Sequence, residues 1–430
     1  MDRRRRSFGL AHAHRGALAL ICAVGAHGAL AQDDAAESRM SAPALKQAFD
    51  AAWSRQPEAV ALGLRRDAAQ AQQKAAQAWT PEPPALTVSN KTDRFNRDLG
   101  ARELDVGVAI PLWLPGERAR SGALAEAELW SVESRARAAQ LRLAGTLREA
   151  WWQWQRAQVD AELARDQRDN ASRLAGDVAR RVKAGDLARA DQHQADGAVA
   201  AAESAAARAQ ASLSNASQQL RVALGGAIQL ASGAPTAAPE AEPPDDAASI
   251  PDPSAHPAFQ DLQDRATIAE RAAALGTVRA RANPELTLVA TRERDFRAER
   301  YDPSITLGVR IPFGAGSRHD ARVAAAQAEA TELQTQLALE RDRIAATQGA
   351  SRERVASARA MLAAAQRRAQ LASESRGFFE KSFRLGETDL PTRLRIEAEA
   401  VEAQRQAASA RIELAAAISQ WRQALGLLPD

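Results

Sequence analysis

Four short segments of the chain alternate apolar with polar residues at a period of two. The apolar positions are Leu86 and Val88, then Leu104, Val106, Val108 and Ile110, then Leu286 and Leu288, and finally Ile305, Leu307, Val309 and Ile311. Such alternation gives a β-strand one apolar and one polar face. We therefore predict strands at residues 85–95, 102–114, 285–296 and 304–314. Each is about ten residues long, a length with which a tilted strand crosses a bilayer.

Long stretches rich in Ala, Arg, Gln, Glu and Leu follow each pair of strands. Proline is almost absent from them, so we predict helices at residues 117–182, 187–224, 319–384 and 390–425. A helix of about 65 residues extends roughly 100 Å at ~1.5 Å per residue. The apolar stripe of these helices is mostly alanine, which lets helix axes approach closely. Composition alone would favour a solvated helical bundle.

These elements occur twice in the same order. The segment VGVAIPLWLPGER at 106–118 is echoed by LGVRIPFGAGSR at 307–318, and Pro84-x-Leu86-Thr87 matches Pro284-x-Leu286-Thr287. A period near 200 residues is far longer than a solenoid repeat of roughly 20–50. We therefore predict a duplicated, domain-sized unit. The expected first repeat covers residues 32–230, a Pro/Ala-rich linker covers 231–255, and the second repeat covers 256–430.

The N-terminus has the pattern of a secretory signal peptide over residues 1–31. Arginines at positions 3–6 precede an apolar stretch, and small residues end at Ala31. The order Arg5-Arg6-Ser7-Phe8 also resembles a twin-arginine signal, and both export routes stay open. The segment contains five of the 57 Lys and Arg, one of the 54 Asp and Glu, and the single cysteine, Cys22. The mature chain would therefore be nearly neutral and cysteine-free, with no basic excess that would indicate a nucleic-acid partner.

No constellation of residues indicates catalysis or a bound cofactor. His193, His256 and His319 are scattered and lack carboxylate or cysteine companions at ligand spacing, so we expect solvated side chains rather than a metal site. Motifs of hydrolases, nucleotide-binding proteins and metalloproteases are also missing. The sequence predicts neither an enzyme nor a cofactor.

Tryptophans cluster in the first long predicted helix. Adjacent tryptophans point to different sides of a helix, so we expect Trp151, Trp152 and Trp154, together with Trp130, to form an internal packing belt. Trp113 lies beside a strand end and is placed as an aromatic anchor at a membrane interface.

Charged loops at residues 91–101 and 292–303 separate the strands of each repeat. Each repeat therefore supplies one hairpin, and the chain supplies four strands. Four strands cannot close a barrel, and an open sheet edge is not tolerated in hydrocarbon. Three copies would supply twelve strands, enough for a closed barrel with a polar lumen. The pattern favours a homotrimer if the sheet lies in a membrane, and a soluble setting otherwise.

The chain resembles the TolC family of outer-membrane efflux proteins over nearly its whole mature length. The strand ends GVAIP and GVRIP carry this resemblance, since each leads through Gly116-x-Arg118 or Gly316-x-Arg318 into a long helix. The turns RVKAGDLARAD and FRLGETDLP are similar to the family's helical tips. The strand-to-helix crossings would use Pro111, Gly116, Pro312 and Gly316.

The resemblance implies an α+β membrane protein whose duplicated unit of one hairpin and long helices supplies four strands per chain. Three chains would form a 12-stranded β-barrel in outer-membrane lipid, continuous with a periplasmic α-helical barrel. Such a protein is the passive exit duct of a tripartite efflux or type I secretion system, working with a periplasmic adaptor and an inner-membrane pump. Its cargo would be small toxic solutes such as metal ions or drugs. The strand ends IPLW and IPFG look similar to the CzcC-like heavy-metal branch.

The resemblance also places adaptor docking and the aperture at the two tips. The residues concerned are Gly185, Asp186, Asp191, Phe383, Gly386, Asp389, Thr392 and Arg395. Gly185 and Gly386 are expected to adopt positive φ where a helix ends, and Asp186 and Asp389 to cap the returning helices.

The second tip departs from the family pattern. Phe383 stands where other members have tyrosine, and Thr388, Thr392 and Arg395 replace the arginine and aspartates that hold the aperture closed. We therefore do not expect the usual ion-pair network, although Asp191 is available to pair with Arg395.

The rival interpretation is a soluble periplasmic coiled-coil scaffold or adaptor. An adaptor has a single helical hairpin flanked by compact β-domains. The two near-equal repeats of this chain, each beginning with a helix, favour the duct.

Overall fold

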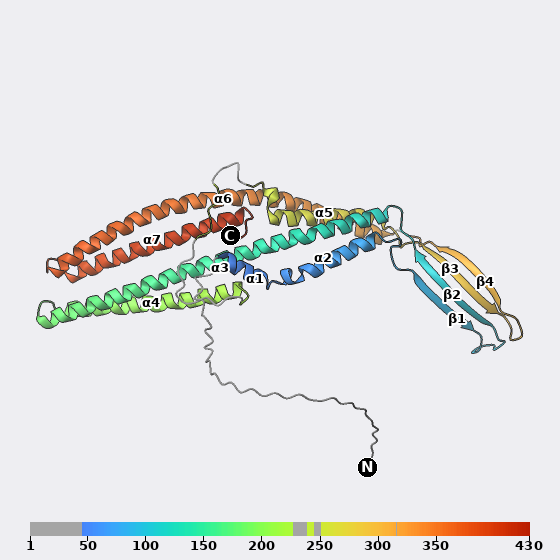
Figure 1. Ribbon diagram of the computed structural model, residues 1–430, viewed down its shortest axis with the longest axis horizontal. Coiled ribbons are helices and arrows are strands. Elements are labelled where there is room, and N and C mark those ends of the chain that lie inside the picture. Colours follow the sequence, from blue (N-terminus) through green and yellow to red (C-terminus); the bar gives the residue numbers. More distant parts are fainter. Residues whose placement is uncertain (1–44, 227–238, 245–250, 315) are drawn as a thin grey trace, which may run out of the picture. The chain divides into compact units, whose positions relative to one another are not determined.

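A computed structural model describes residues 45–226, 239–244 and 251–430, apart from 315 (Figure 1). The predicted signal peptide and most of the predicted linker lie outside these residues. The first repeat contains α1 (Leu45–Trp53), α2 (Pro57–Ala76), β1 (Ala85–Thr92), β2 (Arg102–Pro111), α3 (Glu117–Ala184) and α4 (Arg189–Ala223). After the short helix η2 (Pro253–Ala255), the second contains α5 (Pro257–Val278), β3 (Glu285–Arg294), β4 (Asp302–Arg310), α6 (Ser317–Arg384) and α7 (Leu390–Ala424).

The strands form one antiparallel sheet in the order β1-β2-β3-β4. The two hairpins are joined because β2 pairs with β3, for example through Val108 and Leu288. Within the described chain, β1 and β4 each have a neighbour on one side only. The sheet therefore joins the two repeats and ends in two open edges.

The strands are shorter at their ends than predicted. We predicted strands reaching residues 95 and 114, whereas β1 ends at Thr92 and β2 at Pro111. In the second repeat, β3 ends at Arg294 instead of 296, and β4 ends at Arg310 instead of 314 but begins at Asp302 instead of 304. The ladder of β2 ends at Pro111, because a proline has no N–H to continue the hydrogen bonding.

The apolar residues of the four strands are aligned in rows on one face of the sheet. One row consists of Leu86, Val108, Leu288 and Leu307, and the next of Val88, Val106, Ala290 and Ile305. Most of these side chains are exposed: Leu86 and Leu307 have relative exposures of 69% and 71%. The sheet thus presents a continuous apolar band without a covering layer in the described chain.

The long helices form two hairpins, α3 with α4 and α6 with α7 (Figure 1). Helices α2 and α5 pack along α3, α5 also packs on α6, and α3 contacts α7, so the two hairpins meet through α3 and α7. The turns of both hairpins lie next to each other, because Leu174, Val178 and Ala195 of the first share an apolar cluster with Phe383 and Leu390 of the second.

The main apolar cluster is centred on the tryptophans of α3. Trp151, Trp152 and Trp154 are buried, and the indole N–H of Trp152 donates to the Ser419 hydroxyl of α7 at 2.8 Å. This confirms the predicted belt for these three residues. The prediction was wrong for Trp130, which is 69% exposed, because it lies on a face of α3 that no other described element covers.

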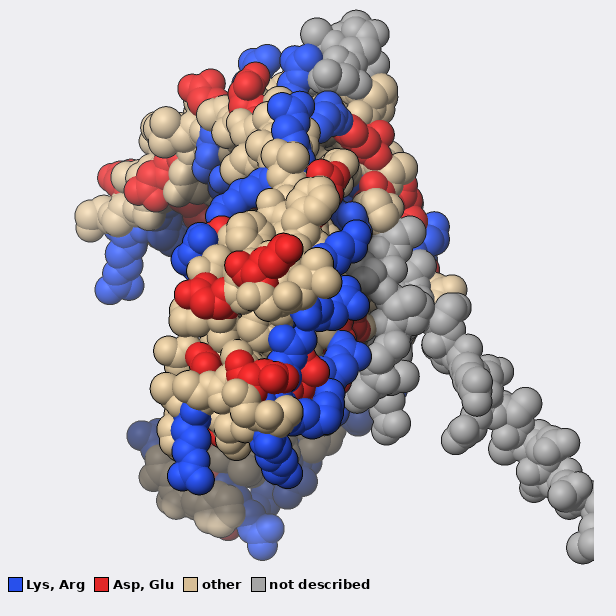
Figure 2. Space-filling view, turned by 90° about the vertical axis from the view of Figure 1, so that its left-hand side faces the viewer, with Lys and Arg blue, Asp and Glu red and all other residues tan. Residues whose placement is uncertain are grey.

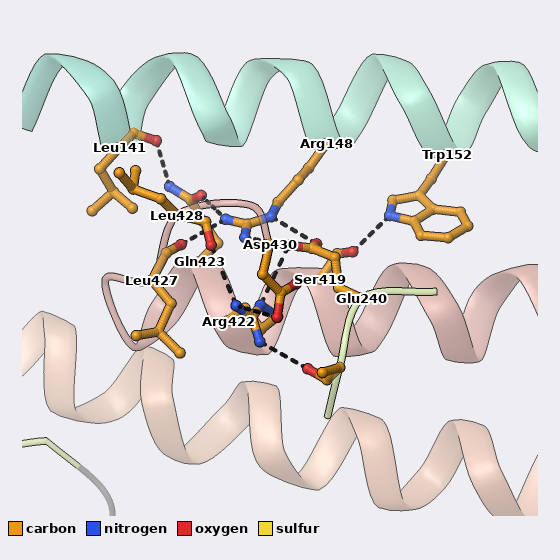
Figure 3. A network of polar contacts seen from close by, with 11 residues as sticks. Leu141, Arg148, Trp152, Glu240, Ser419, Arg422, Gln423, Leu427, Leu428 and Asp430 are labelled. Atoms are coloured by element: carbon orange, nitrogen blue, oxygen red, sulfur yellow. Dashed lines mark hydrogen bonds and ion pairs between the residues drawn. The ribbon is translucent and has the colours of Figure 1, made fainter. Parts of the chain in front are cut away.

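A buried polar network attaches part of the predicted linker to the helices (Figure 3). Glu240 forms ion pairs with Arg148 of α3 at 2.6 Å and with Arg422 of α7 at 3.3 Å. The Arg148 guanidinium also donates to the Gln423 side chain and to the Leu427 carbonyl. The side chains of Arg148 and Glu240 are only 3% and 2% exposed. Sequence composition indicated a linker here and missed the attachment.

No helix among the described residues is long and apolar enough to cross a membrane.

Candidate functional site

The first tip is the turn between α3 and α4. Gly185 has φ 89°, as predicted, and the N–H of Asp186 donates to the Arg181 carbonyl at 2.9 Å, which satisfies the end of α3. Asp186 does not cap the returning helix, contrary to our prediction. Ala188 is the N-cap residue of α4, and the Asp191 carboxylate accepts from the Ala188 N–H at 3.0 Å.

The second tip is the turn between α6 and α7. Gly386 has φ 80°, as predicted, and the N–H of Glu387 donates to the Ser382 carbonyl at 3.0 Å. Asp389 caps α7, as predicted: its carboxylate accepts from the Thr392 N–H at 3.2 Å. This interaction with Thr392 lowers the pKa of Asp389 below the ordinary 3.8.

Phe383 joins the two tips. Its ring is buried and lies 4.9 Å from the Arg181 guanidinium carbon and 5.1 Å from that of Arg393, distances of cation–π contacts. Arg181 belongs to α3, and it also donates to the Phe383 carbonyl at 3.1 Å. Phe383 thus fills the space between the hairpins while two arginines cover its ring.

The ion pair considered between Asp191 and Arg395 is not formed. The Asp191 carboxylate is engaged with its own helix start, and Arg395 donates to Glu399, four residues further along α7, at 2.7 Å. Both partners are held by local contacts, which are closer along the chain than the opposite hairpin. Thr388 contacts the Ser382 hydroxyl at 2.6 Å and makes no ion pair.

Charges of both signs are interspersed over the tip end of the molecule. Figure 2 shows this face with Lys and Arg beside Asp and Glu, and neither sign covers it. Exposed side chains around the turns include Lys183, Asp186, Arg189, Arg384 and Glu387. A partner that binds here would meet a mosaic of charges rather than a single field.

The first strand-to-helix crossing is organised by a residue that sequence reasoning missed. Glu117, the first residue of α3, is 1% exposed. Its carboxylate accepts from Arg279 Nε at 2.7 Å, Asn283 Nδ2 at 2.6 Å and the Leu114 N–H at 3.0 Å. The signal was present in the repeat motif, because Gly116-Glu117-Arg118 has a carboxylate where Gly316-Ser317-Arg318 has a hydroxyl.

The residues predicted at the two strand-to-helix crossings differ in backbone conformation and in their position relative to the strands. Pro111 is the last residue of β2 and is aligned with Glu285. Gly116 has φ 77°, whereas Gly316 is extended at φ −115°, so the crossings differ in backbone conformation. Pro312 follows β4 and lies outside the ladder. Trp113, placed as an interface anchor, is half-buried and donates its indole N–H to the Ala78 carbonyl at 3.2 Å.

The polar face of the sheet explains the glycines repeated in GVAIP and GVRIP. Gly107 lies beside Thr87, and Gly308 lies beside Thr287. A Cβ added at either glycine would come within 2.9 or 2.8 Å of the threonine hydroxyl. On the same face, Asp105 accepts hydrogen bonds from Ser89 at 2.8 Å and Thr291 at 2.7 Å. This face is polar and closely packed, opposite the apolar band.

His256 has a structural role at the start of α5. His256 is the N-cap of α5 and accepts from the Ala258 N–H at 3.2 Å, so it is a structural residue rather than a solvated one. Burial lowers the pKa of His256 from the ordinary 6.5. Among the residues that the structure describes, no cluster of His, Cys, Asp or Glu could hold a metal ion.

Several solved membrane channels and outer-membrane proteins have the same fold. CusC superposes with a TM-score of 0.72 at 16% identity, over 89% of this chain and 92% of CusC. VceC of Vibrio cholerae superposes with 0.71 at 15% identity, over 90% and 97%. The open-state MtrE channel of Neisseria gonorrhoeae superposes with 0.72 at 15% identity, over 90% of each chain. At these identities, the likeness shows the fold.

The amino-acid sequence of the first repeat matches a known protein family. No curated protein sequence matches the chain. Residues 48–226, which cover the first repeat from α1 to the end of α4, match the family described as outer membrane efflux protein. Members of this family are homotrimeric transport channels that work with periplasmic adaptor proteins and inner-membrane pumps. This match assigns residues 48–226 to the outer membrane efflux protein family, the TolC family, and the second repeat has the same order of helices and strands.

Proposed function

We propose that three copies of this chain form the outer-membrane exit duct of a tripartite efflux system. The observation that carries this proposal is the pair of open sheet edges, β1 and β4. Pairing β4 of one copy with β1 of the next would satisfy both edges. Three such pairings complete a closed ring of twelve strands, and closure is what a sheet needs in hydrocarbon.

The two faces of the sheet support the same assembly. The apolar rows that include Leu86 and Leu307 would face lipid, and the face that includes Asp105, Ser89 and Thr291 would line the lumen. An apolar exterior and a polar interior are the pattern of membrane barrels with water-filled channels.

The helix tips are the proposed site of adaptor docking and of the aperture. They expose charged turn residues on both hairpins, and Phe383 with Arg181 and Arg393 links the hairpins at that level. We place the mobile contact of the aperture in this aromatic–arginine cluster, because Asp191 and Arg395 make only local contacts. Gly185, Gly386, Asp389 and Thr392 shape the turns that an adaptor would recognise.

The proposed cargo is a small toxic solute, such as a metal ion or a drug. The strand ends IPLW and IPFG and the short loops support the CzcC-like heavy-metal branch. A deletion strain complemented with this chain separates the two classes: restored growth on zinc, cobalt or cadmium salts supports metals, and restored growth on lipophilic drugs supports drugs. Restored export of a protein substrate alone would favour a type I secretion duct.

The assembly is tested first by membrane fractionation, detergent extraction and native mass determination. We expect a detergent-requiring particle of three chains from the outer membrane. A soluble monomer or dimer in the periplasm would overturn the proposal and favour the scaffold interpretation.

Paired cysteines test the edges directly. A cysteine in β1 at Ser89, combined in turn with one at each residue from Ser304 to Gly308 in β4, should give covalent trimers for at least one pair. The matched control joins Val106→Cys with Ala290→Cys, which are aligned within one chain and should give no oligomer.

A further inference from the structure

The face of the sheet that carries the apolar band changes character near the hairpin loops. Beyond the row of Val88, Val106, Ala290 and Ile305, the same face carries Arg292 beside Leu104, and then Arg294 beside Arg102. Tyr301 lies between the two arginines of β3, with its ring centroid 4.4 Å from the guanidinium carbon of Arg292 and 4.8 Å from that of Arg294.

The opposite face at the same height carries the acidic residues. Glu103, Glu293 and Asp302 are aligned with one another across β2, β3 and β4. Lys91 of β1 is aligned with Glu103 and pairs with it at 2.9 Å. Alternation along the strands therefore separates the charges, with arginines on the apolar face and carboxylates on the lumen face.

Among the described residues, these arginines have no acidic partners. In the part of the chain that the structure describes, no carboxylate lies within ion-pair distance of Arg102, Arg292 or Arg294, and the Nε of Arg294 donates to the Gly100 carbonyl at 3.2 Å. By contrast, Arg297 in the neighbouring loop pairs with Asp98 at 2.6 Å. Unpaired arginines on the apolar face therefore form a distinct group.

A groove of about 460 Å³ lies beside Arg102 and Arg292. Arg94, Arg102, Arg292 and Tyr301 line it, and the exposed ring of Phe95 forms part of its wall. Glu103 also borders the groove, but its carboxylate is engaged by Lys91. The groove combines several guanidinium groups with two aromatic rings at the edge of an apolar band.

We propose that this groove binds the phosphate groups of a lipid headgroup in the outer leaflet of the membrane. Guanidinium groups match phosphate oxygens with two parallel hydrogen bonds, and aromatic side chains favour the interface between acyl chains and water. A lipid is favoured over a free anion because the groove continues the apolar band. Acyl chains could lie along Leu104 and Val106 while the phosphate contacts the arginines.

This inference rests on the proposed placement of the sheet in the outer membrane. The helices occupy the periplasm in this family, so the hairpin loops reach the outer side. The arginines would then lie at the outer boundary of the hydrocarbon, where positively charged groups attract anionic headgroups.

The test measures lipid binding to the detergent-solubilised trimer by native mass spectrometry. The probes are bisphosphorylated lipid A, the same lipid after enzymatic removal of its phosphates, and inorganic phosphate as competitor. R102Q/R292Q should weaken binding of the bisphosphorylated lipid by about tenfold or more. R297Q removes one charge from a neighbouring loop and should bind as the wild type does. R102K/R292K keeps the charge but loses the planar fork, and we expect intermediate binding.

The proposal is overturned if R102Q/R292Q, still trimeric, binds the bisphosphorylated lipid as the wild type does. It is also overturned if the dephosphorylated lipid binds equally well, because the phosphate groups would then not be recognised. Complete displacement of the lipid by millimolar inorganic phosphate would overturn it too, because the lipid part would then not be recognised. If R102Q/R292Q does not form a trimer, two other comparisons test the proposal: R102K/R292K against the wild type, and the bisphosphorylated against the dephosphorylated lipid. Fractionation separates the two proposals: a trimer in the outer membrane with unchanged lipid binding sinks only this inference.

Discussion

The two long hairpins have the same lengths and different burial. Helices α3 and α6 each contain 68 residues, and α4 and α7 each contain 35. Yet α3 has 21 buried residues and α6 has only eight. Likewise, α7 has 13 buried residues and α4 has only four. The duplicated unit was therefore not simply copied into a symmetric bundle. One helix of each repeat became central, and the other remained peripheral.

The peripheral helix α6 exposes apolar side chains along its length. They are Leu339, Met361, Leu371 and Phe378, with exposures from 52% to 68%. Exposed apolar side chains gain free energy when another chain covers them. We expect neighbouring copies of the trimer to cover part of this face, whereas α3 and α7 are already packed within one chain.

The largest effect is expected from a substitution that breaks the attachment between the two central helices, α3 and α7. Glu240→Ala should lower the free energy of unfolding by about 3–5 kcal/mol, because Arg148 would stay buried without an anion, whereas Arg422 would keep its ion pair with Asp430. Guanidinium unfolding followed by helical circular dichroism measures this. The matched control is Glu242→Ala, two residues away, whose pair with Arg359 is exposed and should contribute less than about 1 kcal/mol. Equal effects of the two variants would contradict a role for Glu240 as a buried anchor.

A smaller effect is expected where the hairpins meet at the tips. Phe383→Leu removes the ring between Arg181 and Arg393 and should cost about 1–3 kcal/mol. It should also raise the passage of a normally excluded dye or antibiotic through the duct, measured in whole cells. Phe378→Leu on the same helix is the control, because that ring is 68% exposed. If both variants leak alike, the aperture does not depend on the Phe383 cluster.

The unequal caps of the two tips allow the comparison to be sharpened. Ala188 has the extended backbone of an N-cap residue but no oxygen to accept a hydrogen bond, whereas Asp389 has one. Ala188→Ser should stabilise the first hairpin by about 0.5–1 kcal/mol by completing the reciprocal contact with Asp191. Asp389→Ala should destabilise the second. Thermal melts of the single variants measure both changes, and a loss on Ala188→Ser would show that the turn geometry does not admit the cap.

The smallest effect is a pH dependence that distinguishes the starts of the two repeats. His256 caps α5, whereas Gln56 at the start of α2 makes no side-chain cap. Because burial lowers the pKa of His256, its contribution to stability is fully present above the ordinary value of 6.5 and is lost as pH falls from there through the lower pKa of the folded state. Asp389 also has a lowered pKa, so its contribution is present above 3.8 and is lost at lower pH, as the folded-state pKa is passed.

Melting temperatures from about pH 8 to about pH 3 should therefore fall in two separate windows. His256→Asn keeps a capping oxygen and should flatten only the upper window. Asp389→Asn should flatten only the lower one. A melting curve that is unchanged by either variant would contradict these assignments.

The sequence by itself determined the elements and the family resemblance. Period-two alternation located four strands, the scarcity of proline located four long helices, and the echo of GVAIP in GVRIP showed the duplication. These are local properties, since alternation and helix propensity depend on neighbours within a few residues. Even the positive φ of Gly185 and Gly386 and the cap formed by Asp389 were readable, because turns and caps involve residues within a few positions.

Only the tertiary structure decided how distant segments meet. A strand pattern does not state its neighbours, so the β2–β3 pairing that joins the repeats, and with it the grouping of Arg102 with Arg292 and Arg294, could not be read along the chain. The same holds for Glu240, which composition assigned to a linker, and for Phe383, whose contact with Arg181 crosses 202 positions. Asp191 and Arg395 failed to pair because each found a partner within four residues. A local contact costs little chain entropy, whereas a distant one forms only where packing brings the groups together.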